Sequence, residues 1–246
     1  MSFSAGSYLS FPPEGFTLKW YKIFWNSPNW LNSLRVSIEI ALMTTSISLA
    51  IGVPAAFTLA RKTSRYIRLV LFGVTIPIAF PVVVSAVALY YVFGPLHLVG
   101  TKLGLSLAHS TLSIPIVVLP LRAILLRFDE RLEWQAITLG ASRFRAFWTI
   151  TLPLLKVPLL TVSLFAFITS FDEVVFALFL GSGTIVTVPK RVWEGLRFDI
   201  EPTVAVVATI IVLVASLVLI NLIILDNYFA KRLNKSYLKE DHGNHK

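Results

Sequence analysis

The chain has 246 residues, of which 56% are hydrophobic and only 14% are charged, and its mean hydropathy is +0.76. Soluble proteins carry about 25% charged residues, and disordered segments are poor in apolar residues, so this composition excludes both classes. The chain contains no cysteine, which excludes a disulfide framework, a thiolate metal site and a cysteine nucleophile.

An all-α, polytopic helical membrane protein is therefore expected. Residues 1–33 form an expected external N-terminal segment, whose aromatic residues Trp20 and Tyr21 are typical of the headgroup region. This segment lacks the charged start and apolar run of a signal peptide.

Five apolar stretches follow in the chain, and each predicts a transmembrane helix. About 20 mostly apolar residues cross the hydrocarbon core of a bilayer as a helix. The expected spans form the transmembrane domain 34–226, and in chain order they lie near 34–60, 69–94, 104–126, 157–180 and 203–226. Within this domain, His109 and His97 are expected on or near an external loop.

The distribution of basic residues predicts the orientation. Fifteen of the 22 Lys and Arg residues lie in residues 61–68, in residues 122–156 and in the basic tail 227–246. Because Lys and Arg are enriched in cytoplasmic loops, these segments are expected to be cytoplasmic, with the N-terminus outside and the C-terminus inside. This topology accounts for the net charge of +9 without nucleic-acid binding.

Residues 127–156, which we call the 127–156 loop, are too polar for lipid and too patterned for a plain linker. The stretch from Glu133 to Gly140 is expected to be helical, and its small residues Ala136 and Gly140 would share one face and permit a close approach. Two interpretations remain open at this point: an amphipathic helix on the membrane surface, or a docking element for a cytosolic partner.

The spacing in this loop resembles the cytoplasmic signature of bacterial ABC importer permeases. That signature is Glu-Ala-Ala, three residues, Gly, nine residues, Ile, one residue and Leu-Pro. The chain departs from it at Trp134 and Gln135, and its acidic residue Glu133 stands one position earlier. The resemblance implies that the contact with an ATPase is made by Glu133, Ala136, Gly140, Ala141, Ile150, Leu152 and Pro153.

Three further segments, 10–21, 170–173 and 191–197, resemble spermidine/putrescine-type permeases. This resemblance implies the type I ABC importer permease fold. Members of that family have six spans, so the first of them is expected to be absent here, through a truncation or the assignment of the start site.

Asp172 and Glu173 are the acidic pair inside an expected span. A carboxylate at a helix centre costs about 2.5–3.5 kcal/mol, so the pair either lines a polar path or lies at the outer interface beside a basic residue such as Arg35. The candidate path residues for a polycation are Asp172, Glu173, Phe171 and Trp193, the aromatic ones through cation–π contacts. Arg35 and Glu39, four residues apart, are expected to pair.

The resemblance implies a transport subunit of a bacterial cytoplasmic-membrane importer rather than an enzyme. The sequence has no P-loop motif, so ATP and Mg²⁺ are expected on a partner, a dimeric cytosolic ABC ATPase. The other expected partners are an external substrate-binding protein, a second permease subunit of different sequence, and membrane lipid. Polyamines are the expected substrate, and the alternatives are a permease for sulfate, molybdate or ferric iron, an integral membrane enzyme, and a channel or secondary transporter.

Overall fold

The computed structural model describes residues 2–6, 15–62, 64–198, 202–213 and 216. These residues are helical or irregular apart from one isolated β-bridge between Ser4 and Phe16. The chain divides into two units, residues 1–24 with 200–246 and residues 25–199. Parts of three expected features lie outside the described residues: residues 10–14 of the segment 10–21, most of the last span beyond Leu213, and the whole tail 227–246.

Helix α1 (Lys19–Asn26) begins in the first unit and ends in the second. Within the first unit, the N-terminal residues fold back on its first six residues. The indole Nε1 of Trp20 donates a hydrogen bond to the Ser4 carbonyl at 2.9 Å, and the Tyr21 hydroxyl donates to Ser2 Oγ at 3.1 Å. The same unit contains an apolar helix at Thr203–Leu213, within the range of the last expected span.

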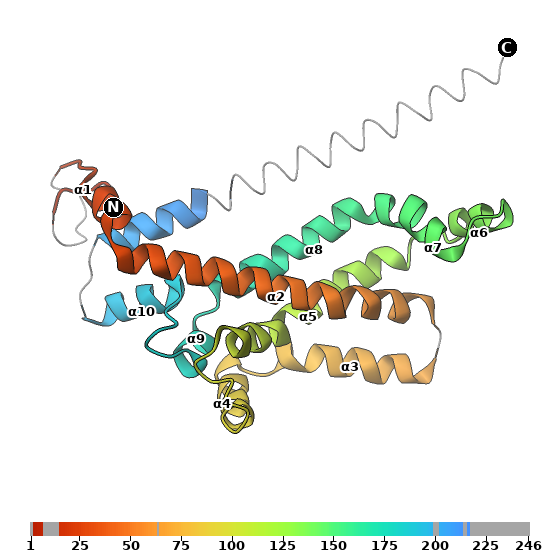
Figure 1. Ribbon diagram of the computed structural model, residues 1–246, viewed down its shortest axis with the longest axis horizontal. Helices are drawn as coiled ribbons and strands as arrows, with labels where there is room; N and C mark the ends of the chain where they lie inside the picture. The colour runs from red at the N-terminus through yellow and green to blue at the C-terminus, as the bar shows by residue number, and fades with distance from the viewer. Residues whose placement is uncertain (1, 7–14, 63, 199–201, 214–215, 217–246) are drawn as a thin grey trace, which may run out of the picture. The chain divides into compact units, whose positions relative to one another are not determined.

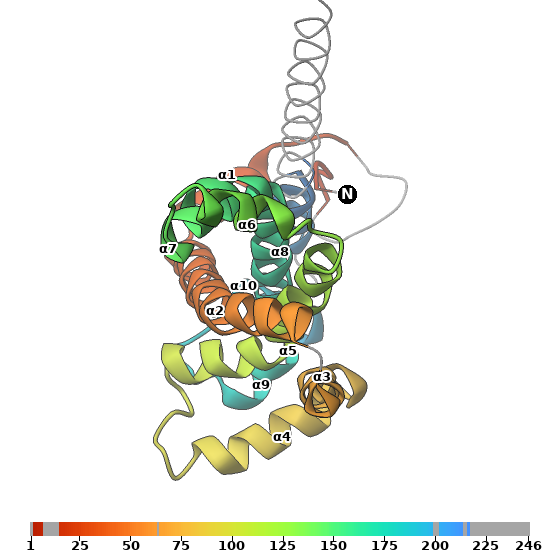
Figure 2. The same cartoon turned by 90° about the vertical axis from the view of Figure 1, so that its right-hand side faces the viewer.

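Three long helices form the core of the second unit: α2 (Pro28–Arg61), α5 (Lys102–Leu125) and α8 (Leu152–Asp172). Each of them packs against the other two (Figures 1 and 2). A short helix, α7 (Arg143–Ala146), and a π-helical turn (Phe147–Thr151) run directly into α8 and extend it to 30 residues. In the described part of the chain, α2, α5 and this extended α8 are long and apolar enough to cross a membrane.

Small residues line the contact face of α2. In lipid, helices associate through close packing and interhelical hydrogen bonds, so small residues that let backbones approach are favoured there. The Thr44 hydroxyl donates to the Ser106 carbonyl of α5 at 3.2 Å. The buried small residues recur every three or four positions along α2: Ser33, Ser37, Ala41, Thr44, Ser48, Gly52 and Ala56.

The range 69–94, expected as one helix, contains two: α3 (Arg65–Ala79) and α4 (Val82–Phe93), which meet at 104°. The break falls at Phe80 and Pro81. Proline has no N–H and disfavours helical backbone in the residue before it, and Phe80 accordingly has an extended conformation, with φ −90° and ψ 146°.

The range 157–180 is also interrupted. Helix α8 ends at Asp172, Glu173 is extended, and a short helix, α9 (Val175–Leu180), follows. The 127–156 loop contains α6 (Arg131–Thr138), and α10 (Val188–Phe198) follows α9. Within this unit, α6 and α7 lie at the end where α2 and α5 finish, which we call the loop end, and α9 and α10 lie at the opposite end (Figure 1).

Candidate functional site

The 127–156 loop begins with α6, which stops at Thr138 in a glycine-terminated turn. The Gly140 N–H donates to the Ile137 carbonyl and the Ala141 N–H to the Ala136 carbonyl, both at 3.0 Å. These two bonds and the Gly140 φ of +93° form a Schellman motif. The prediction that Ala136 and Gly140 share a helix face is wrong, because the helix ends two residues before Gly140.

The second half of the loop rises into the long α8. Ser142 caps α7, with its hydroxyl oxygen accepting from the Arg145 N–H at 3.2 Å. The next turn is π-helical, since the Leu152 N–H donates to the Phe147 carbonyl five residues earlier. Pro153 has no N–H to continue an α-helical ladder, which favours such a widened turn. Ile150 lies within this turn, and Leu152 and Pro153 open α8.

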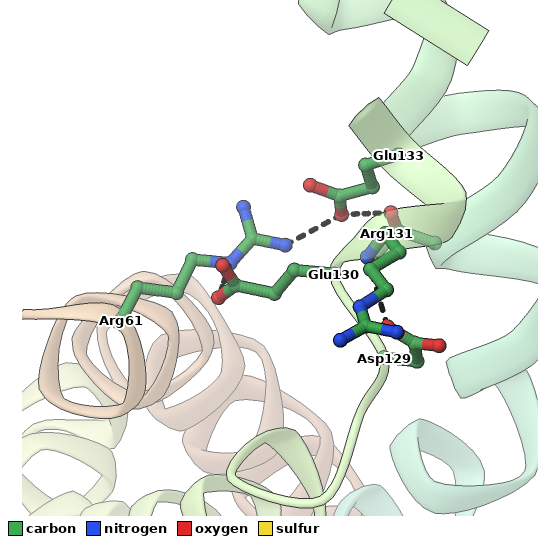
Figure 3. A network of polar contacts seen from close by, with 6 residues as sticks. Arg61, Asp129, Glu130, Arg131 and Glu133 are labelled. Atoms are coloured by element: carbon green, nitrogen blue, oxygen red, sulfur yellow. Dashed lines mark hydrogen bonds and ion pairs between the residues drawn. The ribbon is translucent and has the colours of Figure 1, made fainter. Parts of the chain in front are cut away.

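Glu133 lies at the centre of a polar network that joins the loop to α2 (Figure 3). The Arg61 Nη2 donates to Glu133 Oε1 at 2.5 Å, and Arg61 Nε lies 3.5 Å from Glu130 Oε1. The buried Thr151 hydroxyl also donates to Glu133 Oε1. The Glu133 side chain is 15% exposed, so this carboxylate is largely enclosed by its partners.

Apolar side chains project from the same loop into the surroundings. Leu139 is 89% exposed, Phe144 is 74% exposed and Trp134 is 56% exposed. The Phe144 and Trp148 rings lie 5.9 Å apart, and the Arg143 guanidinium lies 6.0 Å from the Trp134 ring. Exposed apolar clusters with polar neighbours mark surfaces that bind a protein or a membrane.

The four candidate path residues lie at the opposite end and form no single cluster. Asp172 is exposed and makes no hydrogen bond or ion pair with the described residues. The Glu173 carboxylate accepts from the N–H groups of Val175 at 2.7 Å and Phe176 at 3.2 Å, so it caps α9. Phe171 stacks on Phe167 in α8 with ring centres 5.9 Å apart, and Trp193 is 45% exposed on α10.

The expected pair of Arg35 and Glu39 is confirmed, with Nε and Oε1 2.8 Å apart. The Lys102 amine joins it at 2.5 Å from Glu39 Oε2, which connects α2 to the start of α5. Arg191 of α10 donates from Nε to Ser33 Oγ at 2.7 Å, so this basic residue is engaged with α2.

His109 is a buried polar residue of the helix core, and the prediction of an external-loop position is wrong. Its side chain is 1% exposed in α5, and Nδ1 lies 2.8 Å from Ser170 Oγ of α8. Its ring lies 5.9 Å from that of Phe176. The position of His109 inside an apolar stretch was the sequence signal for burial. No group of three or more His, Asp or Glu side chains among the described residues could hold a metal ion.

The model of the family described as "Binding-protein-dependent transport system inner membrane component" matches residues 48–235. The chain is 33% identical over 215 residues to the molybdenum transport system permease protein ModB of Mycobacterium tuberculosis, covering 80% of this chain and 81% of ModB. It is 30% identical over 210 residues to the spermidine/putrescine transport system permease protein PotC of Escherichia coli, covering 84% of this chain and 78% of PotC.

A solved structure shares the fold. It is described as a bacterial ABC transporter involved in the import of the acidic polysaccharide alginate, and it matches with a TM-score of 0.69 at 17% identity. The match covers 89% of this chain and 85% of that one. The helices described above therefore form a type I permease fold.

Proposed function

The chain belongs to the family of binding-protein-dependent transport system inner membrane components, and from this premise we propose that it couples solute entry to ATP hydrolysis on a separate cytosolic chain. It is a multi-pass permease component of an ABC importer. In the proposed assembly, an external binding protein delivers the solute and two ATPase subunits bind ATP and Mg²⁺. A second permease subunit of different sequence completes the path.

The exposed apolar side chains of the 127–156 loop carry this proposal. A helix that lies on a membrane has basic residues on its polar face and its apolar residues on one opposite face. Helix α6 is instead preceded by Asp129 and Glu130, and within it the basic Arg131 is balanced by Glu133. The two most exposed apolar residues of the loop, Leu139 and Phe144, lie outside α6, in the turn and in α7. A cytosolic protein partner fits this arrangement better than a lipid surface.

The proposed mechanism uses the continuity between the loop and the helix core. ATP binding draws the two ATPase subunits together, and they carry α6 and α7 with them. Helix α7 runs through the π-helical turn into α8 without a break, so a displacement of the loop is transmitted to α8, which packs against α2 and α5. The helices then separate at the end of the path where they were packed closed, and they pack closed at the other end. This exchange is alternating access.

For the substrate, we propose a polyamine, as for the relatives that transport spermidine and putrescine. Asp172 is exposed at the opposite end and has no cationic partner among the described residues. An exposed carboxylate without a cationic partner is suited to attract an ammonium group of a polyamine. Glu173 is less suited, because its oxygen already accepts two backbone hydrogen bonds.

Molybdate is the second candidate, favoured by the 33% identity to ModB. The opposite end carries several basic side chains that would suit an oxyanion, but Lys102 is paired with Glu39 and Arg191 with Ser33. The Ser33 hydroxyl is uncharged and leaves the positive charge of Arg191 in place, so the preference for the polyamine rests on the exposed Asp172 and not on these pairings.

Transport assays with Asp172→Asn test the substrate proposal. Uptake of labelled spermidine, putrescine and molybdate is measured in cells that produce the importer with wild-type or variant chain. Because the variant removes the unpaired carboxylate, we expect spermidine uptake to fall roughly tenfold, equivalent to about 1.4 kcal/mol of lost interaction.

Glu194→Gln is the matched control, since it removes one negative charge from α10 at the same end and Glu194 has no ion pair with a described residue. The control is expected to transport at the wild-type rate. The polyamine proposal would be overturned if wild type and Asp172→Asn took up spermidine equally, or if the cells accumulated molybdate in place of polyamines. Neither result would contradict the membership of the permease family.

A further inference from the structure

The contact between Arg61 and the 127–156 loop joins parts of the chain that are distant in sequence. Arg61 is the last residue of α2, and Glu133 lies 72 positions later in α6. The guanidinium contacts two carboxylates, Glu133 through Nη2 and Glu130 through Nε, in the geometry drawn in Figure 3. Arginine is suited to such a contact because its planar group presents several donors in a fixed arrangement.

Apolar contacts run beside this ion pair and hold the same elements. The Arg61 guanidinium lies 5.2 Å from the centre of the Phe57 ring, one turn earlier in α2. The Phe57 ring in turn meets the Phe147 ring of the π-helical turn edge to face, at 5.7 Å. The end of α2 therefore contacts the loop at both α6 and the π-helical turn.

The last turn of α2 is also fixed to the helix core. Arg122 of α5 donates from Nε to the Leu59 carbonyl at 3.1 Å. Leu59 and Arg61 lie in the same turn, so a force applied to Arg61 acts on a turn held by α5. The contacts form a continuous physical connection from α6 through α2 to α5.

Lys62, the residue after Arg61, allows the two basic side chains at the end of α2 to be compared. Lys62 carries the same charge at the same end of α2, and it is exposed, with no side-chain hydrogen bond or ion pair to a described residue. A basic residue needed only for membrane orientation would serve equally well at either position. The difference between them is the pair of carboxylates that Arg61 holds.

We infer that Arg61 is a positioning residue that transmits the movement of α6 to α2 during transport. This inference rests on the proposed function, since it presumes that an ATPase moves the loop. Arg61 itself need not contact the ATPase or the solute. Its effect is to make α2 follow the loop, so that α2 moves along with α8 when the path switches.

The test uses the full importer, reconstituted in liposomes with its ATPase, its second permease subunit and its binding protein. ATP hydrolysis, uptake and retention of the ATPase are measured for wild type, Arg61→Gln, Arg61→Lys and Lys62→Gln. We expect Arg61→Gln to retain the ATPase and to hydrolyse ATP while uptake per ATP falls roughly tenfold. Arg61→Lys should recover part of this loss, because a lysine still pairs with Glu133, and Lys62→Gln should match wild type.

A double-mutant cycle with Glu133→Gln makes the result specific to the pair. If the two residues act through each other, the double variant loses no more coupling than the worse single variant. Wild-type uptake per ATP by Arg61→Gln, release of the ATPase by that variant, or equal loss in the Gln and Lys variants would each overturn the inference. Failure of the wild-type chain to retain any ATPase would instead refute the proposed function.

Discussion

Gly140 has a φ of +93°, and a Cβ atom built on it would meet no atom within 4 Å. A side chain at this position would therefore have enough space within the chain itself. The left-handed backbone is what favours a glycine, because in that conformation a Cβ crowds the following carbonyl at a cost of about 1–2 kcal/mol. The sequence pattern located Gly140 correctly in the loop but suggested smallness as its reason, and only the backbone angle separates the two explanations.

Two substitutions distinguish conformation from size at Gly140. Asparagine adopts left-handed backbone more readily than alanine, although it is larger. We therefore expect Gly140→Asn to retain more uptake and a higher unfolding temperature than Gly140→Ala, whose backbone is destabilised by about 1–2 kcal/mol. ATP-driven uptake and thermal unfolding of the purified chain in detergent measure the two effects. The reverse order, with alanine tolerated better, would show that a close approach at Gly140 is what matters.

At the scale of helices, α2 and α5 are held close together at Gly52. A Cβ atom built on Gly52 would lie 2.8 Å from Val117 Cγ1, closer than side chains approach one another. In a membrane, where water does not drive helices together, such small-residue contacts supply much of the packing energy.

Gly52→Ala is therefore expected to force α2 and α5 apart and to destabilise the chain by about 1–3 kcal/mol. Gly73→Ala is the matched control, because a Cβ on Gly73 in α3 meets nothing within 4 Å. Thermal unfolding in detergent compares the two variants with wild type. Equal unfolding temperatures for both would contradict the close packing of α2 on α5.

The sequence did not predict which prolines interrupt a helix. Apolar length alone located α2 and α5, because a bilayer demands about 20 apolar residues. Pro54, Pro115 and Pro120 lie inside those helices without ending them, whereas Pro81 marks a bend of 104°. Membrane helices tolerate prolines when neighbours satisfy the freed backbone groups, and the sequence does not specify which neighbours are available.

Across the second unit as a whole, the two ends differ in character. The loop end combines exposed apolar residues with the charged network of Arg61, Glu130 and Glu133. The opposite end holds the exposed Asp172 and the pair of Lys102 and Glu39. The sequence predicted where the loop and the acidic pair lie along the chain. It did not predict that Glu133 pairs with a residue 72 positions away or that Glu173 caps a helix, because both depend on how helices meet in space.

The central claim, that this chain moves a solute only when a partner hydrolyses ATP, is tested most directly in liposomes that contain the purified importer. Uptake of whichever solute the cells accumulate is measured with ATP, with a non-hydrolysable analogue, and with an ion gradient but no nucleotide. We expect uptake with ATP alone, at a rate that follows ATP hydrolysis. Uptake driven by the ion gradient, without ATP, would contradict the assignment and identify a secondary transporter or a channel.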